Sequence, residues 1–119
     1  MDDGAVALGN ALGMNETLEV LMLNGNNIGD AGLLSLASQG LSKNETLTEL
    51  HISGNRIGTD AIQALAFMLK PSGIAPPRSK LTRVDIRGMA IPCTAGHALA
   101  KSLRLPVKNV LFSGVQSFN

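Results

Sequence analysis

Residues 15 to 29 read NETLEVLMLNGNNIG, and residues 44 to 58 read NETLTELHISGNRIG. The two stretches align without a gap, so every matched pair is separated by 29 residues. A self-similar period of this length predicts that one supersecondary unit is built several times and stacked. The matched apolar and asparagine positions are Leu18 and Leu47, Leu21 and Leu50, Leu23 and Ile52, Asn26 and Asn55, and Ile28 and Ile57.

Weaker copies of the same pattern flank these two stretches. A third copy begins at Leu81 and carries Val84, Ile86, Met89 and Ile91, and a degenerate fourth holds Val107, Val110, Phe112 and Val115. The start of the chain resembles the helical half of a repeat whose strand is missing. We therefore expect one domain over residues 1–119, divided into a helical half-repeat 1–17, repeats 18–46, 47–80 and 81–106, and a terminal copy 107–119.

Each copy has the form LxxLxLxxNxI followed by a helical stretch. The alternation of Leu50 and Ile52 is typical of a short strand with one buried face, while apolar spacing in 61–69 indicates a helix. One such unit cannot cover its own apolar face, so the units must stack. The fold class expected is a right-handed α/β solenoid with a parallel sheet on the concave side and helices on the convex side. The expected strands lie near 20–23, 49–53, 83–87 and 109–112, and the expected helices near 4–13, 31–42, 60–70 and 94–104.

Asn26 and Asn55 stand where each chain segment leaves its strand. An amide there can bond backbone groups that the turn removes from the sheet, so we expect a structural asparagine ladder. Met89 takes this place in the third copy and cannot make these bonds, which predicts a looser or terminal turn. Residues 70–80, KPSGIAPPRSK, cannot continue a helix and are expected to bulge out between helix and strand.

The segments LMLNGNNIGDAGLLSLASQGLSKNETL and LHISGNRIGTDAIQALAFML resemble the ribonuclease-inhibitor-like class of leucine-rich repeats. That class includes ribonuclease inhibitor, NOD-like receptor sensors, Ran GTPase-activating proteins, capping-protein linkers and ciliary scaffold subunits. The common property that the resemblance implies is binding of a protein partner. The chain departs from the pattern at Met89, at Pro92 in place of Gly29 and Gly58, and in the insertion before Leu81.

Side chains between the buried strand positions must point to the opposite side of the sheet, which we call the concave face. Arginines there can bind carboxylates or phosphates in a bidentate manner, and the first row adds apolar side chains. The predicted partner-binding residues are Val20, Met22, Asn24, Glu49, His51, Ser53, Arg56, Arg83, Asp85 and Arg87, with Asn109, Leu111 and Ser113 as a less regular last row.

Composition excludes several other classes of function. The 119 residues are 45% hydrophobic and 16% charged, with no Trp or Tyr, which indicates one compact domain and disfavours single-stranded nucleic-acid binding. No segment is apolar enough to span a membrane, and we expect no secretory signal, because no basic region precedes the first apolar residues. The lone Cys93 fits a reducing compartment, so we expect a cytoplasmic or nuclear protein. Charge is polarised: seven acids and two bases precede residue 60, whereas eight bases and two acids lie from residue 60 onward.

The sequence contains no strong motif for catalysis, metal binding or phosphate binding. His51, Ser53 and Asp85 superficially assemble a catalytic triad, but side chains two residues apart on a strand project in parallel, and a surface pair of His51 with Asp85 is favoured. The scattered His51, Cys93 and His97 do not predict a zinc site, and the glycine turns lack phosphate-binding spacings, so no metal or cofactor is expected. The NET triplets are explained by the repeat.

We therefore expect a non-catalytic interaction module that is part of a larger leucine-rich-repeat protein and binds a protein through the concave face. Two alternatives stay open: a regulator of an enzyme, such as a GTPase-activating or ribonuclease-inhibiting protein, and a scaffold subunit of a cytoskeletal or ciliary assembly. Self-association through exposed solenoid ends is also possible, since each end lacks a stacked neighbour.

Overall fold

The computed structural model describes residues 2–69, 80–89 and 91–111. Most of the expected insertion 70–80 and the last residues of the fourth copy, Phe112 and Ser113 included, lie outside the described residues.

Short strands form one parallel sheet in sequence order. They are β1 (Val20–Met22), β2 (Glu49–His51), β3 (Arg83–Asp85) and β4 (Val110–Leu111). Each pairs in parallel with the next, and the same position of every repeat lies in register, with Leu21 beside Leu50, Leu50 beside Val84 and Val84 beside Val110. The expected fourth strand is thus present as β4.

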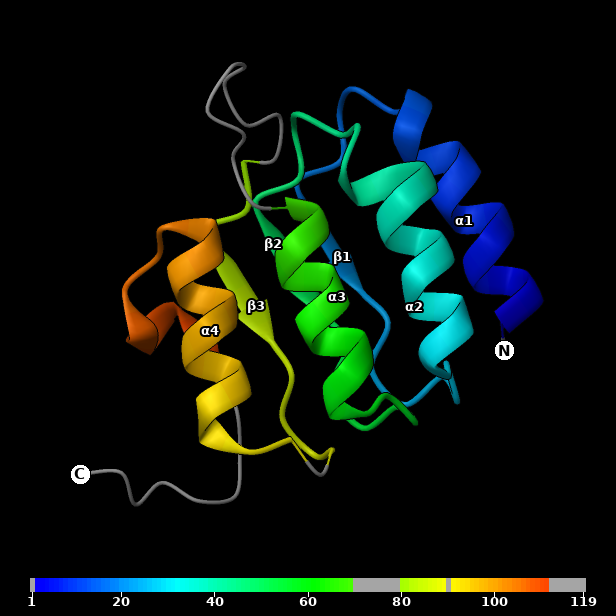
Figure 1. Ribbon diagram of the computed structural model, residues 1–119. Coiled ribbons are helices and arrows are strands. Elements are labelled where there is room, and N and C mark those ends of the chain that lie inside the picture. The colour runs from blue at the N-terminus through cyan, green and yellow to red at the C-terminus, as the bar shows by residue number, and fades with distance from the viewer. Residues whose placement is uncertain (1, 70–79, 90, 112–119) are drawn as a thin grey trace.

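Helices cover one side of this sheet. α1 (Asp2–Met14), α2 (Asp30–Leu36), α3 (Thr59–Leu69) and α4 (Cys93–Leu103) lie side by side in one layer in front of the strands (Figure 1). A 3₁₀ turn, η2 (Val107–Asn109), leads into β4. The α/β solenoid predicted from the repeat is confirmed.

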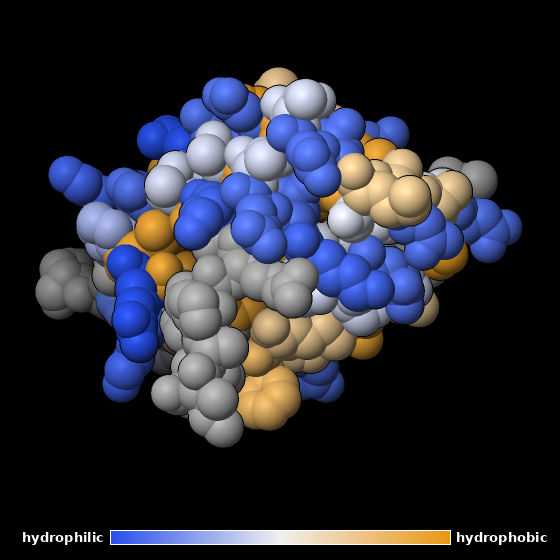
Figure 2. All heavy atoms as spheres, turned by 90° about the horizontal axis from the view of Figure 1, so that it is seen from above, coloured by the Kyte–Doolittle hydropathy of each residue, from blue (hydrophilic) through white to orange (hydrophobic). Residues whose placement is uncertain are grey.

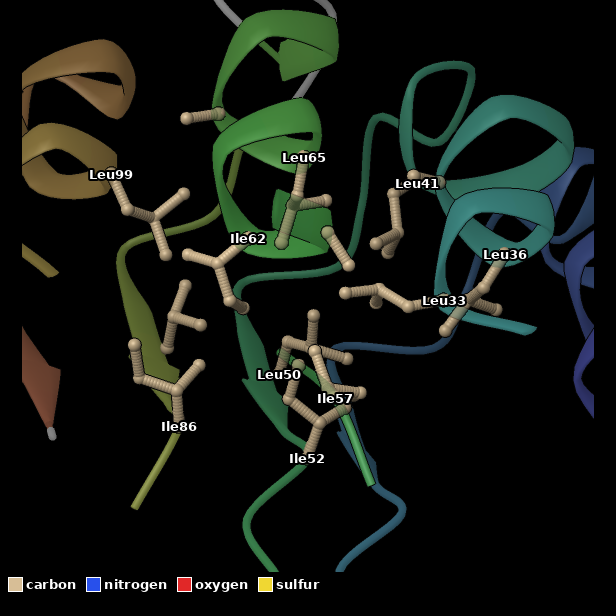
Figure 3. Close-up of a cluster of buried hydrophobic side chains, with 14 of the residues drawn as sticks. Leu33, Leu36, Leu41, Leu50, Ile52, Ile57, Ile62, Leu65, Ile86 and Leu99 are labelled. Carbon is tan, nitrogen blue, oxygen red and sulfur yellow. The ribbon is translucent and has the colours of Figure 1, made fainter. Parts of the chain in front are cut away.

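The core lies between the two layers because every second strand residue points toward the helices. Leu50, Ile52 and Ile86 from the strands meet Leu33, Ile62, Leu65 and Leu99 from the helices (Figure 3). Leu50 is 0% exposed, as are Ile52 and Ile62. Each repeat therefore buries its strand leucines against the helices of its own and neighbouring repeats.

The turns after the strands repeat one conformation. Gly25, Gly54 and Gly88 have φ of 68°, 68° and 75°, a left-handed region that favours glycine. Hydrogen bonds connect successive turns. The N–H of Gly25 donates to the backbone carbonyl of Ser53, and the N–H of Gly54 donates to the backbone carbonyl of Arg87, each over 2.9 Å. The Gly88 turn is therefore bonded to the preceding turn as the Gly54 turn is, but Met89 cannot supply the side-chain bonds that Asn55 makes to the turn before it. Met89 is 9% exposed and fills the place of the asparagine as a core side chain.

The second helix departs from the expected continuous span 31–42. α2 ends at Leu36 and continues as a π-helical turn, η1 (Ala37–Leu41), in which the N–H of Ser42 donates to the carbonyl of Ala37 over 2.9 Å. Here α1 packs very closely, because a Cβ on Gly40 would lie 2.8 Å from the Gly9 carbonyl oxygen. The glycines thus permit a helix contact that larger residues would prevent.

Candidate partner-binding face

The concave face is built by strand residues that alternate with the buried ones. On β1 these are Val20 and Met22, whose exposed fractions are 43% and 63%. On β2 they are Glu49 and His51, both half-buried, and on β3 Arg83 is exposed. The face therefore carries apolar side chains at its β1 edge and charged ones toward β3.

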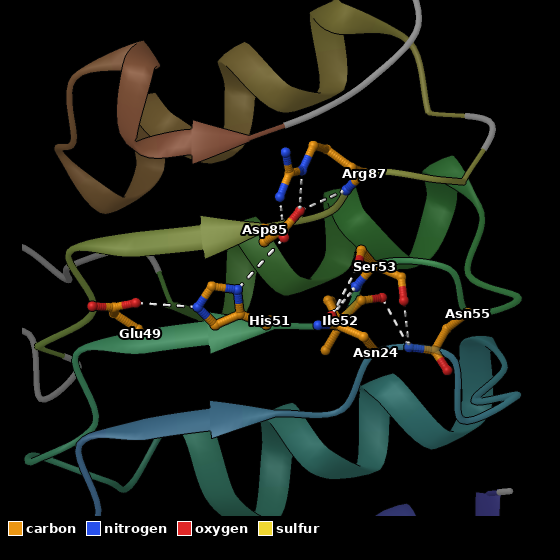
Figure 4. A network of polar contacts seen from close by, with 8 residues as sticks. All are labelled: Asn24, Glu49, His51, Ile52, Ser53, Asn55, Asp85 and Arg87. Carbon is orange, nitrogen blue, oxygen red and sulfur yellow. Dashed lines mark hydrogen bonds and ion pairs between the residues drawn. The ribbon is translucent and has the colours of Figure 1, made fainter.

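Four charged or titratable side chains form a connected network across β2 and β3 (Figure 4). The Nε2 atom of His51 lies 3.1 Å from Glu49 Oε1, and its Nδ1 atom lies 3.5 Å from Asp85 Oδ2. Arg87 donates to Asp85 through Nε and Nη2, each over 3.0 Å. The His51–Asp85 pair expected from the sequence is thus present, within a larger network.

Asp85 requires a correction. It was expected to present its carboxylate on the concave face, but it is only 3% exposed, because His51 and Arg87 lie over it. Burial alone would raise the pKa of Asp85, but hydrogen bonds from the Arg87 side chain and backbone, with its charge, lower the pKa below the usual value. Asp85 is therefore a charged anchor for its neighbours and not itself a contact for a partner.

The Arg87 guanidinium is already bound to a carboxylate within the protein. Its guanidinium holds the Asp85 carboxylate in a two-point contact, and the Asp85 carboxylate raises the pKa of Arg87. Arg87 was expected to bind an anionic group of a partner together with Arg83. Among the described residues no carboxylate pairs with Arg83, so Arg83 is the arginine of this row that is open to a partner.

Ser53 and His51 do not form a nucleophile and base. The Ser53 hydroxyl lies 2.8 Å from Asn24 Oδ1, and the same oxygen accepts the Ser53 backbone N–H over 2.9 Å. Both ring nitrogens of His51 face carboxylates instead. The contacts of Asn24 and Ser53 therefore link the rows of β1 and β2 and fix the rim of the concave face.

The other residues that were predicted to bind a partner lie at the edges of the concave face. Arg56 is exposed beyond the end of β2, and its backbone N–H donates to the Ile28 carbonyl over 2.8 Å. Leu111 on β4 is half-buried, as is Asn109, whose amide donates to the Thr82 carbonyl over 2.9 Å. Sequence reasoning missed the two-point Asp85–Arg87 contact. Its signal is an acid and an arginine two residues apart on one strand face.

Other surfaces offer less. Seen from the end where the strands begin, the visible apolar surface is broken into separate patches by hydrophilic side chains (Figure 2). Within the described ranges, no three His, Cys, Asp or Glu side chains gather in a way that could hold a metal ion. None of the described helices has the length and apolar character needed to cross a bilayer.

Comparisons with known proteins agree with this architecture. Two stretches, residues 15–37 and 43–66, match the family model described as Leucine Rich repeat. They coincide with the two clearest copies in the sequence, so these two stretches are similar to leucine-rich repeats. No curated protein matches the chain in sequence.

A solved structure titled Leiomodin-1 actin-binding site 2 is similar in fold, with a TM-score of 0.73 and 19% sequence identity. The match covers 95% of this chain and 64% of that one. At this identity the likeness establishes the shared fold. The shared fold extends over 95% of this chain, well beyond the two stretches that match the family model.

Proposed function

We propose that this leucine-rich-repeat chain is a non-catalytic interaction module, part of a larger leucine-rich-repeat protein, which binds a protein partner through its concave face. The observation that carries the proposal is the juxtaposition of exposed Val20 and Met22 with the charged network of β2 and β3. Apolar contacts beside oriented arginines are characteristic of protein interfaces.

The network favours binding because it is already ordered. Both carboxylate oxygens of Asp85 accept hydrogen bonds from the Arg87 guanidinium, and Asp85 also lies beside His51. These side chains therefore lose little further conformational freedom when a partner binds. The carboxylate of Asp85 is satisfied inside the protein, which leaves the exposed donors of Arg87 and the whole of Arg83 turned outward. A partner with a carboxylate next to an apolar side chain would complement this layout.

A pair of charge reversals tests the proposal. Arg83→Glu changes the concave face, and Lys101→Glu makes the same change on an exposed position of α4 on the opposite side. With a partner in hand, Arg83→Glu should weaken binding by about tenfold or more, since an interfacial charge is reversed, while Lys101→Glu should leave affinity nearly unchanged. Equal effects of the two reversals would remove the concave face as the binding surface.

Actin is the first named protein to test as a partner. The support is that the solved chain sharing this fold is titled an actin-binding site. Actin as a partner would also agree with the alternative that the chain is a scaffold subunit of a cytoskeletal assembly. Titration of labelled actin with the chain and with Arg83→Glu distinguishes binding through the concave face from binding elsewhere.

Two finer assignments belong to this proposal. The ribonuclease-inhibitor-like subtype is supported by a full α-helix in the repeats, such as the 11-residue helices α3 and α4. A cytoplasmic location is supported by the single cysteine of the sequence. A regulator of a GTPase or a ribonuclease would need contacts spread over more repeats than these residues build.

A further inference from the structure

His51 lies between two carboxylates that come from different strands. Its Nε2 atom is 3.1 Å from Oε1 of Glu49 on β2, and its Nδ1 atom is 3.5 Å from Oδ2 of Asp85 on β3 (Figure 4). On the other side of β2, the residue level with His51 is Met22, which carries no charge. An ionised carboxylate only accepts hydrogen bonds, and a neutral imidazole has one N–H and one lone pair. Only the doubly protonated imidazolium therefore donates to both carboxylates at once.

The two carboxylates differ in how firmly they are held. Asp85 is buried, and it accepts the Arg87 backbone N–H over 3.1 Å in addition to two hydrogen bonds from the Arg87 guanidinium. The Glu49 side chain is 37% exposed, and among the described residues its carboxylate is bonded by His51 alone. When the imidazole loses one proton, its remaining N–H therefore stays with Asp85. The lone pair on Nε2 then faces the Glu49 carboxylate and repels it.

Glu49 has a second cation beside it on the concave face. The strand register sets Glu49 level with Arg83 of β3, and neighbouring strands lie about 4.8 Å apart. Arg83 is exposed, and within the described part of the chain no carboxylate pairs with it. Because opposite charges at this separation attract each other, a Glu49 carboxylate released by His51 can pair with Arg83 instead.

We propose that the protonation of His51 controls whether Arg83 is open to an anionic partner. When His51 is an imidazolium, Glu49 is bound to it and Arg83 can bind a carboxylate of the partner. When His51 is neutral, Glu49 pairs with Arg83 and competes with that carboxylate. Imidazole ordinarily changes its charge between about pH 5 and pH 8, so the concave face should bind an anionic partner more tightly at the acidic end of this range.

The exchange of Glu49 between two cations is tested without any partner, by nuclear magnetic resonance of the full chain from about pH 5 to about pH 8. The signals followed are those of the His51 ring and of the Arg83 guanidinium carbon, Cζ. In the unmodified chain both signals should shift with the same midpoint, because Arg83 gains an ion pair as His51 loses its charge. An Arg83 signal that stays constant while His51 titrates would overturn the proposal.

Two variants separate the exchange from the direct electric field of the imidazolium. Glu49→Gln leaves a neutral amide that does not compete for Arg83, so the shift of the Arg83 signal should be lost. Glu19→Gln removes an exposed acid that lies outside the concave face and should keep the shift. Circular dichroism establishes that both variants are folded. A shift of the Arg83 signal that persists in Glu49→Gln would overturn the proposal.

Sulfate serves as the anionic probe of Arg83, because its charge stays constant over this range of pH. Its dissociation constant, followed at the same Arg83 signal, should be about two- to fivefold lower at about pH 5.5 than at about pH 8, since an exposed ion pair is a weak competitor. In Glu49→Gln the two constants should be nearly equal. Equal constants in the unmodified chain would contradict the proposal, as would an undiminished difference in Glu49→Gln.

The consequence for partner binding rests on the proposed function, whereas the exchange of Glu49 between His51 and Arg83 does not. Because the resonance and sulfate measurements use no protein partner, their failure would leave the concave face as a binding surface without control by His51. Conversely, equal effects of Arg83→Glu and Lys101→Glu on a partner would remove the binding surface and leave the exchange intact.

Discussion

The side-chain oxygen of Asn55 lies 2.9 Å from the backbone nitrogen of Asn26, its counterpart one repeat earlier. The same oxygen accepts the N–H of Ile28 over 2.9 Å, and the amide nitrogen of Asn55 donates to the carbonyls of Leu23 and Ile52. Asn55 therefore holds the turn of the preceding repeat as well as the end of its own strand. These hydrogen bonds therefore stabilise the stacking of one repeat on the next.

Replacing Asn55 by Ala should destabilise the fold strongly. The substitution leaves buried donors and acceptors of two repeats without partners, at a cost of about 2–4 kcal/mol in the free energy of unfolding. Asn26→Ala is the matched control, because Asn26 is exposed at the β1 end while Asn55 is 7% exposed. Urea unfolding measures both. A cost at Asn26 equal to that at Asn55 would contradict the role assigned to the preceding turn.

The Asp85–Arg87 contact predicts a pH dependence of stability. The pKa of Asp85 is lower in the folded chain than the unfolded value of about 3.9, so ionised Asp85 stabilises the fold above about pH 4. This contribution is lost as pH falls through the lower folded pKa, because protonation then favours the unfolded chain.

Asp85→Asn isolates that contribution. At pH 7 the variant should be less stable by no more than about 1 kcal/mol, because Arg87 is half exposed and its charge is screened by water. The difference between the variant and the unmodified chain should shrink as pH falls below about 4. Urea midpoints at several pH values give the answer, and a difference that grows in acid would have the wrong sign.

Glycine at position 40 should be required for the contact of α1 with η1. Gly40→Ala forces a Cβ to 2.8 Å from the Gly9 carbonyl and should cost about 1–3 kcal/mol by pushing the helices apart. Gly4→Ala, also in a helix, meets nothing within 4 Å and should instead stabilise α1 by up to about 1 kcal/mol. Thermal unfolding of the two variants should thus shift in opposite directions, and a tolerated Gly40→Ala would disprove the close packing.

The repeat made much of the fold predictable. Because matched residues recur at a fixed spacing, the sequence located β1, β2 and β3 and the helices α3 and α4 to within a few residues. The expected strand at 49–53 ends earlier, at His51, because the chain turns toward the asparagine. The π-helical turn at Ala37–Leu41 was not predicted, since it arises from the contact of Gly40 with another helix and not from local sequence.

The candidate site was predictable only in part. Alternation along the strands identified which residues share the concave face, and it brought His51 beside Asp85 as expected. Alternation says nothing about how side chains on that face bond with one another. Arg87 therefore was expected to face a partner, whereas it folds over Asp85 and buries it.

Site-specific photo-crosslinking tests the central claim, that a protein partner binds the concave face, most directly. A photoreactive residue is placed at Arg83 in one variant and at Lys101 of α4 in another, and crosslinked proteins are identified in extracts of the source cells, with unmodified chain as competitor. The account predicts a discrete protein captured from position 83, absent from position 101 and lost on competition. Capture of the same protein from position 101, with none from position 83, would contradict it.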